Sequence, residues 1–431
     1  MTEEHSTLSA DTSVVSAERA LSTVHGRISG LAGLLWLAAF AIGVAGFAVA
    51  LGSDPQRAWM NVWGNFLFWT ALAQAGVIFA AVLVVAKGHW GKPFRRIAEA
   101  TGAFLPFSLI IFLLMYFGAP EIFPWMKPGF EGHINRDWLT HDGVFIRNGI
   151  LLAILFGASW YFLRLSLRPD APMIAQKQTG WRKAMLERLS RGWRGDEEEA
   201  ERARSILAWF APVLIGLWVI IFSLLSFDLT MSLMPSFMSM IWGALYFVGG
   251  WLSMLAIVAF LAHRYKEHYS LEDVWGKWEF HDLGKLMFAF VIFWSYSWFS
   301  QFLPIWYGNI GRETQFFELR VDNGFKPLLW AQMTLFFFIP FALLLWRKPK
   351  MRSRHLAIVG VVILLGFWLE RWMQVVPSVW KGEGPPLGWQ ELTIALGFLG
   401  LFGLSYSLYQ SVMAKIPVQE ALIIGERSRG P

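Results

Sequence analysis

The segment NVWGNFLFWTALAQAGVIFAAVLVVA, at residues 61–86, contains no charged side chain. A helix rises about 1.5 Å per residue, so a run of this length is long enough to cross the roughly 30 Å hydrocarbon core of a bilayer. Lipid offers no water to the backbone N–H and C=O groups, and a helix satisfies these groups internally. The segment therefore predicts a transmembrane helix.

Similar apolar runs recur along the rest of the chain. They lack the alternation of polar and apolar residues that is typical of a membrane β-barrel. We therefore expect an all-α integral membrane protein with about ten transmembrane helices. The predicted spans cover residues 28–51, 61–86, 97–117, 143–163, 206–227, 237–262, 281–306, 327–346, 355–376 and 389–410.

The composition agrees with this class and limits the chemistry. Hydrophobic residues make up 55% of the 431 residues and charged residues 16%, against roughly 25% charged residues in a soluble domain. The chain has no cysteine, which excludes a disulfide, an iron–sulfur cluster on its own thiolates and a covalently attached c-type haem. None of the nine histidines lies at the middle of a predicted span, so a haem between two histidines is not expected.

Basic residues predict the orientation. If the N-terminus is cytoplasmic, 27 of the 37 Lys and Arg residues lie in cytoplasmic segments and 7 in the opposite loops. The positive-inside rule then places both termini in the cytoplasm. The polar residues 1–27 are interpreted as a tail without a cleavable apolar core. The net charge of +6 reflects these loops and not a nucleic-acid-binding surface.

A possible internal repeat relates the two halves of the chain. Residues 60–68 resemble residues 239–247 at an offset of 179, and both stretches enter the membrane from the same side. The repeat predicts two four-helix bundles in parallel orientation. The predicted units are an N-terminal tail, a flanking helix, a first bundle, a second bundle, and a last flanking helix with the C-terminal tail, at residues 1–27, 28–60, 61–236, 237–388 and 389–431.

Polar side chains near the extracytoplasmic ends of the spans form an outer group. A charge inside a bilayer costs several kcal/mol, so it needs a partner, a water-filled cavity or a function. Such a group could bind a quinone headgroup and accept its protons, or form an outer proton site. Asp142 could instead be a helix N-terminal charge favoured by the dipole. The group comprises His141, Asp142, Arg147, Asp228, Gln301, Glu370 and Arg371.

An inner group lies near the cytoplasmic ends. Glu99 belongs to the third span, while His281, Asp282 and Lys285 share one face of the seventh. These residues could relay protons. They could equally be interfacial residues that form ion pairs or extend toward water.

The seventh span also carries a resemblance to a known family. The stretches FHDLGKLMFAF (residues 280–290) and WFSQFLPIWYGNI (residues 298–310) resemble the second large membrane subunit of bacterial alternative complex III, the quinol:cytochrome c or electron acceptor oxidoreductase. That subunit belongs to the NrfD-like, polysulfide-reductase membrane-anchor family. The chain departs from the family at Gly311-Arg312, where proline and glutamate are common, and at Pro304.

The resemblance implies a non-autonomous subunit in the bacterial inner membrane, with ten helices in two four-helix bundles and a flanking helix at each end. The implied partners are a sister NrfD-like membrane subunit, an iron–sulfur subunit and c-type cytochrome subunits, together with lipid and a quinol such as menaquinol. Iron–sulfur clusters and haem c would belong to those partners, and this chain would hold no metal.

Two roles are compatible with the resemblance, namely quinol binding and proton translocation. In the family the better-supported quinol site lies in the sister subunit. A stand-alone secondary transporter is the alternative from another class, and a discontinuous helix pair at matching places in the two halves would favour it. A purely structural anchor is the third possibility, and it predicts that the buried charges are paired with one another and reach no water.

Overall fold

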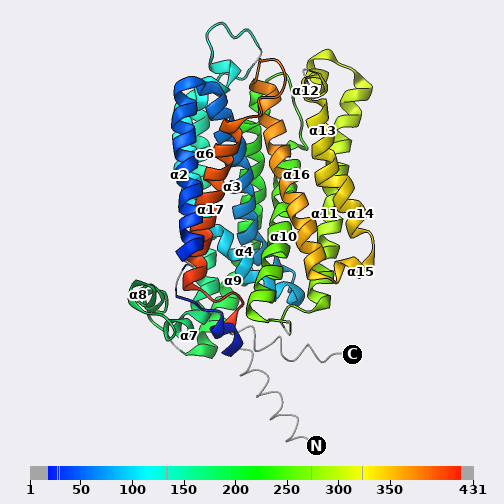
Figure 1. Cartoon of the computed structure of the whole chain (residues 1–431). Coiled ribbons are helices and arrows are strands. Elements are labelled where there is room, and N and C mark those ends of the chain that lie inside the picture. Colours follow the sequence, from blue (N-terminus) through cyan, green and yellow to red (C-terminus); the bar gives the residue numbers. More distant parts are fainter. Residues whose placement is uncertain are drawn as a thin grey trace, which may run out of the picture.

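The computed structural model describes residues 18–418 except 27, 29, 133, 194, 273 and 323. All regular structure in this described part is helical, and ten helical segments are long and apolar enough to cross a membrane (Figure 1). The prediction of an all-α integral membrane protein is confirmed.

The ten segments follow the predicted spans closely. Seven are single helices, namely α2 (Gly30–Ser53), α3 (Pro55–Val85), α9 (Asp196–Leu229), α10 (Trp242–Tyr269), α11 (Lys277–Gly308), α16 (Ser353–Val379) and α17 (Trp389–Val412). The other three contain breaks or short extensions, namely η1–α4–η2–α5 (His89–Phe94, Arg95–Glu99, Ala100–Phe104, Leu105–Ile122), α6–η4–α7 (His141–Leu167, Arg168–Asp170, Ala171–Ala175) and α13–η6–α14 (Lys326–Met333, Thr334–Phe338, Ile339–Leu344).

Helix contacts arrange eight of the segments in two rings of four. In the first bundle α3 packs on α5, α5 on α6, α6 on α9 and α9 on α3. In the second bundle α10 packs on α11, α11 on α14, α14 on α16 and α16 on α10. Helix α3 joins the bundles by packing on both α10 and α16. These contacts group eight of the ten segments into two four-helix bundles.

The first and last spans form a pair beside the first bundle. Helices α2 and α17 lie side by side along their length and pack against α3 (Figure 1). A Cβ atom on Gly43 would lie 2.1 Å from the Cα of Gly397, so the two backbones touch at this crossing. Small residues allow such close approach between membrane helices. The flanking helices are therefore neighbours in space, although they come from opposite ends of the sequence.

The charge-free run at residues 61–86 lies in the most buried of the ten spans, α3. A helix that is apolar on all sides fits the centre of a large protein as well as lipid. Helix α2, by contrast, is mostly exposed. The run that predicts membrane insertion therefore faces mainly other helices.

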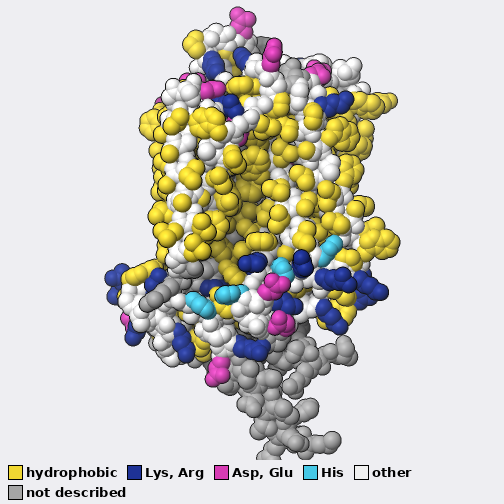
Figure 2. All heavy atoms as spheres, in the orientation of Figure 1, with side chains coloured by type: hydrophobic (Ala, Val, Ile, Leu, Met, Phe, Trp, Pro, Cys, Tyr) yellow, Lys and Arg dark blue, Asp and Glu magenta, His cyan; other side chains and the backbone are white. Residues whose placement is uncertain are grey.

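Charged side chains gather at the two ends of the molecule, on either side of an apolar band (Figure 2). Helices α7, α8 (Gly180–Leu189) and α15 (Arg347–Lys350) lie at one end, which we call the α15 end. Helix α12 (Gly311–Val321) lies at the opposite end, the α12 end (Figure 1). The Lys and Arg count predicts that the α15 end is cytoplasmic.

Candidate functional site

The most buried charges of the second bundle are adjacent on α16. Glu370 is 3% exposed and Arg371 is 0% exposed. One turn later, Gln374 Nε2 donates to Glu370 Oε1 (2.6 Å), and Gln374 Oε1 accepts from Arg371 Nη1 (2.7 Å). Arg371 Nη2 also donates to the carbonyl of Tyr246 on α10 (2.9 Å). Helical spacing brings the three side chains of α16 together, and α10 fixes the guanidinium.

Several polar atoms beside this group lack hydrogen bonds. Glu370 Oε2 lies 3.3 Å from Arg371 Nε, close enough for an ion pair, but neither atom has a hydrogen-bond partner among the described residues. The side-chain amide of Gln301 on α11 is buried, and neither its nitrogen nor its oxygen has a hydrogen-bond partner among the described residues. An unsatisfied buried polar group costs about 1–3 kcal/mol. These atoms therefore mark a place where a bound molecule would be stabilised.

A cavity of about 30 Å³ lies at this place. Its polar lining consists of Gln301, Arg320, Gln332, Glu370 and Gln374, and the rest of its wall is aromatic and aliphatic. A cavity of roughly 10–15 Å³ holds one water molecule if polar partners are present. The site therefore has room and hydrogen-bonding groups for one or two water molecules next to a carboxyl group.

Arg320 is the charged residue of this site that was not predicted from the sequence, and Gln332 and Gln374 were not predicted either. The Lys and Arg count places it in an outer loop, whereas the structure buries it at the end of α12. Its Nε donates to the Met373 carbonyl (3.0 Å), and its Nη2 donates to the Gln374 carbonyl (3.0 Å) and to Ser378 Oγ (2.9 Å). Pro377 has no N–H, so the carbonyl of Met373 four residues earlier lacks its helical donor. That proline is the signal that could have indicated a buried donor.

The site contains more positive than negative side chains. Arg371 and Arg320 are the two cations whose charges interact with the Glu370 carboxyl group. Burial lowers the pKa of the Arg320 guanidinium, while the negative charge of Glu370 opposes that shift. Arginine nevertheless keeps its proton in proteins. Glu370 is thus the one carboxyl group at the cavity that can gain or lose a proton, between two fixed cations.

The structure places Arg147 and Asp228 elsewhere, on α6 and α9 of the first bundle. Arg147 Nη2 and Asp228 Oδ2 form an ion pair of 2.6 Å. Asn148 Nδ2 donates to the same oxygen (2.7 Å), and Trp138 Nε1 donates to Asp228 Oδ1 (2.9 Å). Both carboxylate oxygens are satisfied, so this pair has the form of a structural contact. The predicted outer group is therefore divided between the two bundles, because the helices that carry its residues belong to different bundles.

His141 and Asp142 form a third, more exposed cluster with Tyr116 of α5. The Tyr116 hydroxyl donates to Asp142 Oδ1 (2.7 Å), and the rings of Tyr116 and His141 stack with 4.0 Å between their centroids. Asp142 is exposed and His141 is partly buried. This cluster lies on the outside of the first bundle and does not contact Glu370.

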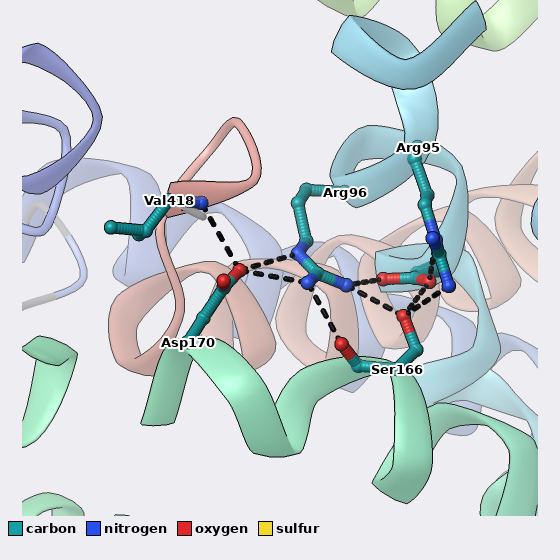
Figure 3. A network of polar contacts seen from close by, with 6 residues as sticks. Arg95, Arg96, Ser166, Asp170 and Val418 are labelled. Carbon is teal, nitrogen blue, oxygen red and sulfur yellow. Dashed lines mark hydrogen bonds and ion pairs between the residues drawn. The ribbon is translucent and has the colours of Figure 1, made fainter. Parts of the chain in front are cut away.

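Glu99 of the inner group belongs to a buried ion network at the α15 end. Its carboxylate pairs with Arg95 (2.8 Å) and with Arg96, and it also accepts from Ser166. Arg96 Nη2 reaches on to Asp170 Oδ2 (2.7 Å), and Figure 3 shows Arg96 between Ser166 and Asp170. Two arginines and two carboxylates balance each other, so the network is neutral and its carboxylates are paired.

The other three inner residues lie on α11 and share no contact with that network among the described interactions. Lys285 Nζ pairs with Asp282 Oδ1 (2.7 Å), and His281 Nδ1 lies 3.6 Å from the same oxygen. The side chain of Lys285 is 57% exposed and that of Asp282 is 33% exposed. Exposed ion pairs contribute little to stability. This geometry agrees with the interfacial interpretation better than with a buried relay.

Comparison with known proteins adds no assignment, since neither a protein-family model nor a curated protein sequence matches the chain. The functional argument therefore depends on the site geometry and on the resemblance of residues 280–310.

Proposed function

We propose that this chain is a membrane subunit of a bacterial quinol:electron acceptor oxidoreductase of the alternative complex III type, and that Glu370 is a proton-binding group within it. The resemblance of the seventh span supports membership of the complex. Electrons would pass through iron–sulfur and haem c partners, because the chain has no cysteine with which to hold those groups. Its own contribution would be proton transfer coupled to quinol oxidation.

The unsatisfied Oε2 of Glu370 beside the 30 Å³ cavity is the observation that carries the proposal. A carboxyl group can exchange a proton only if a donor or acceptor reaches it, and a water molecule in the cavity would do so. Asp228 and Glu99 have no such free oxygen, since protein donors satisfy both of them. Glu370 is thus distinguished from the other buried acids by its surroundings.

The structural-anchor hypothesis predicts that buried charges are paired with one another and reach no water. Both Arg147–Asp228 and Glu370–Arg371 are paired, but Glu370 lines a cavity with room for water and its Oε2 has no hydrogen bond among the described residues. A stand-alone transporter would be favoured by broken helices at matching positions of the two halves. The breaks include η2 in the third span, η4 just after the fourth and the π-helical segment η6 in the eighth. The repeat pairs the third span with the seventh and the fourth with the eighth. Because η4 lies beyond the predicted span at 143–163 whereas η6 lies inside the one at 327–346, these breaks do not match.

Quinol binding in this chain is the second candidate role. The His141–Tyr116–Asp142 cluster supplies an imidazole and a carboxylate at a surface that is open to the side. These residues do not line the cavity beside Glu370, and the Asp142 carboxylate and the His141 ring already contact Tyr116. The proton-transfer role is therefore better supported by geometry.

Purification of the tagged chain from its native membrane tests the first part of the proposal. We expect c-type haem absorbance and an iron–sulfur signal to co-purify with the chain. Recovery of the chain without any redox partner would reject membership of a respiratory complex.

Replacement of Glu370 by Gln tests the second part, in the intact complex reconstituted into vesicles. Quinol oxidation should continue, while the number of protons moved per electron should fall. Glu187→Gln is the control, because Glu187 lies exposed on α8. An unchanged proton stoichiometry in Glu370→Gln would reject the proposed role of Glu370.

A further inference from the structure

Helix α12 stands between two hollows at its end of the molecule. Phe316 and Arg320 line the 30 Å³ cavity beside Glu370. Arg312 and Leu319 line a second hollow of about 570 Å³, which we call the outer hollow. Residues 312 and 319 are two turns apart on one helix face, whereas 316 and 320 are one turn apart on another. One helix therefore forms part of the wall of both spaces.

The outer hollow lies between the two halves of the molecule. Residues 130–132 and 233–236, from loops that follow the first bundle's helices, form one side. Ser378 and Lys381, at and beyond the end of α16, form another. The hollow has a mixed polar and apolar lining and is many times larger than the buried cavity. It can hold water in contact with the α12 end.

A side-chain hydrogen bond links the linings of the two spaces. Ser378 lines the outer hollow and Arg320 lines the cavity, and Arg320 Nη2 donates to Ser378 Oγ at 2.9 Å. The guanidinium is held in place by bonds to the carbonyls of Met373 and Gln374 and by a position 3.3 Å above the Phe316 ring. It is therefore a fixed cation at the boundary between the cavity and the outer hollow.

We infer that the Arg320–Ser378 contact is the closure between the Glu370 site and water at the α12 end. The inference deepens the proposed function and rests on it, since it names the side from which Glu370 exchanges protons. A fixed arginine in a narrow passage repels cations and protons. The closed contact thus prevents protons from returning to Glu370 from the outer hollow, and displacement of Arg320 from Ser378 opens the passage.

Silver-ion access to a cysteine in the cavity tests this closure. The chain has no cysteine, so Gln301→Cys supplies its one reactive thiol. Ag⁺ is small enough to follow a path made for water, and it is added to membrane vesicles with the α12 end outward. The thiol that remains is then counted by alkylation of the denatured chain and mass spectrometry. We expect slow reaction in Gln301→Cys alone.

Reaction should become at least about 10-fold faster when Arg320→Lys or Ser378→Ala is added, because each removes part of the Arg320–Ser378 contact. Ser253→Ala is the matched control, since Ser253 is buried on α10 and donates to the Gly249 carbonyl. If Arg320→Lys does not assemble, Ser378→Ala alone decides the result. Equal rates in the Ser378→Ala and Ser253→Ala backgrounds, or faster entry from the α15 end, would overturn the inference.

The two proposals fail in different ways. An unchanged proton stoichiometry in Glu370→Gln rejects the proposed function, whatever the silver-ion rates are. Uniform silver-ion rates reject the closure but leave a loss of proton movement in Glu370→Gln intact.

Discussion

At the level of single residues, the buried acids differ in how their charge is compensated. Glu99 lies between two arginines, and Asp228 accepts hydrogen bonds on both oxygens. Glu370 has one oxygen bound by Gln374 and one facing Arg371 without a hydrogen bond. Glu370 is therefore suited to proton exchange, because its oxygen without a hydrogen bond can take up a proton and no existing hydrogen bond is lost.

Replacement of Arg371 should show how strongly the stability of the protein depends on the charges of the Glu370–Arg371 pair. Arg371→Met leaves Glu370 buried without its adjacent cation, which we expect to cost about 3–5 kcal/mol. The double variant Glu370→Gln with Arg371→Met should cost less than the sum of the two single changes, because neither charge is then left alone. Thermal unfolding of the three variants in detergent checks this. Strict additivity would show that the two side chains are energetically independent.

The sequence predicts part of the site at this scale. Hydropathy places Glu370 and Arg371 inside a span, and the structure buries both of them. It cannot tell which spans face a common interior, because that depends on how the helices are rotated and paired. For this reason the outer group is divided between the bundles. Arg320 was missed because its loop position gives no indication that α12 folds back onto α16.

At the level of elements, the spans were predictable because long apolar runs have no stable alternative to a helix in lipid. The breaks within them were not. The 3-10 segment η2 and the π-helical segment η6 depend on local packing, which an average over a hydropathy window does not register. The burial of the short chain segment that follows α17 was also not expected.

That segment, residues 413–418, is irregular as far as residue 417 and yet buried throughout. The Lys415 amide donates to Thr23 Oγ1 (3.0 Å), and the Val418 amide donates to Asp170 Oδ2 (3.2 Å). Figure 3 shows Val418 beside Asp170. Satisfied backbone groups allow irregular chain to remain buried. The segment therefore covers the Asp170 side of the buried ion network.

Docking of this segment should depend on pH through Lys415. Burial lowers the pKa of Lys415 to about 7, against about 10.4 for a free lysine. The charged form is disfavoured in the docked segment, so docking is weakest below pH 7 and strengthens between pH 7 and the free value, by up to about 1.4 kcal/mol per pH unit.

Limited proteolysis of the segment in the wild-type chain and in Lys415→Met measures this effect. The cleavage rate of the wild-type chain, divided by that of Lys415→Met, should fall as the pH rises from about 7 to about 9. The wild-type segment docks more tightly as Lys415 loses its proton, whereas Met at this position does not titrate. A ratio that stays constant over this range contradicts a titrating Lys415.

At the level of the whole molecule, the charge distribution makes a prediction about orientation. Basic side chains are numerous at the α15 end, below the apolar band (Figure 2). A membrane-impermeant maleimide should label Glu187→Cys of α8 only in inside-out vesicles and Glu318→Cys of α12 only in right-side-out vesicles. The absence of other cysteines makes the labelling specific to these positions of the chain. The reverse pattern would invert the predicted topology.

The central claim is that Glu370 gains and loses a proton while the complex turns over. Infrared difference spectroscopy of the assembled complex, comparing quinol-reduced and oxidised states, observes this directly through the C=O stretch of a protonated carboxyl group. We predict a carboxyl band in the wild-type difference spectrum that is absent in Glu370→Gln and present in the exposed control Glu187→Gln. Identical carboxyl regions in the wild type and Glu370→Gln would contradict the account.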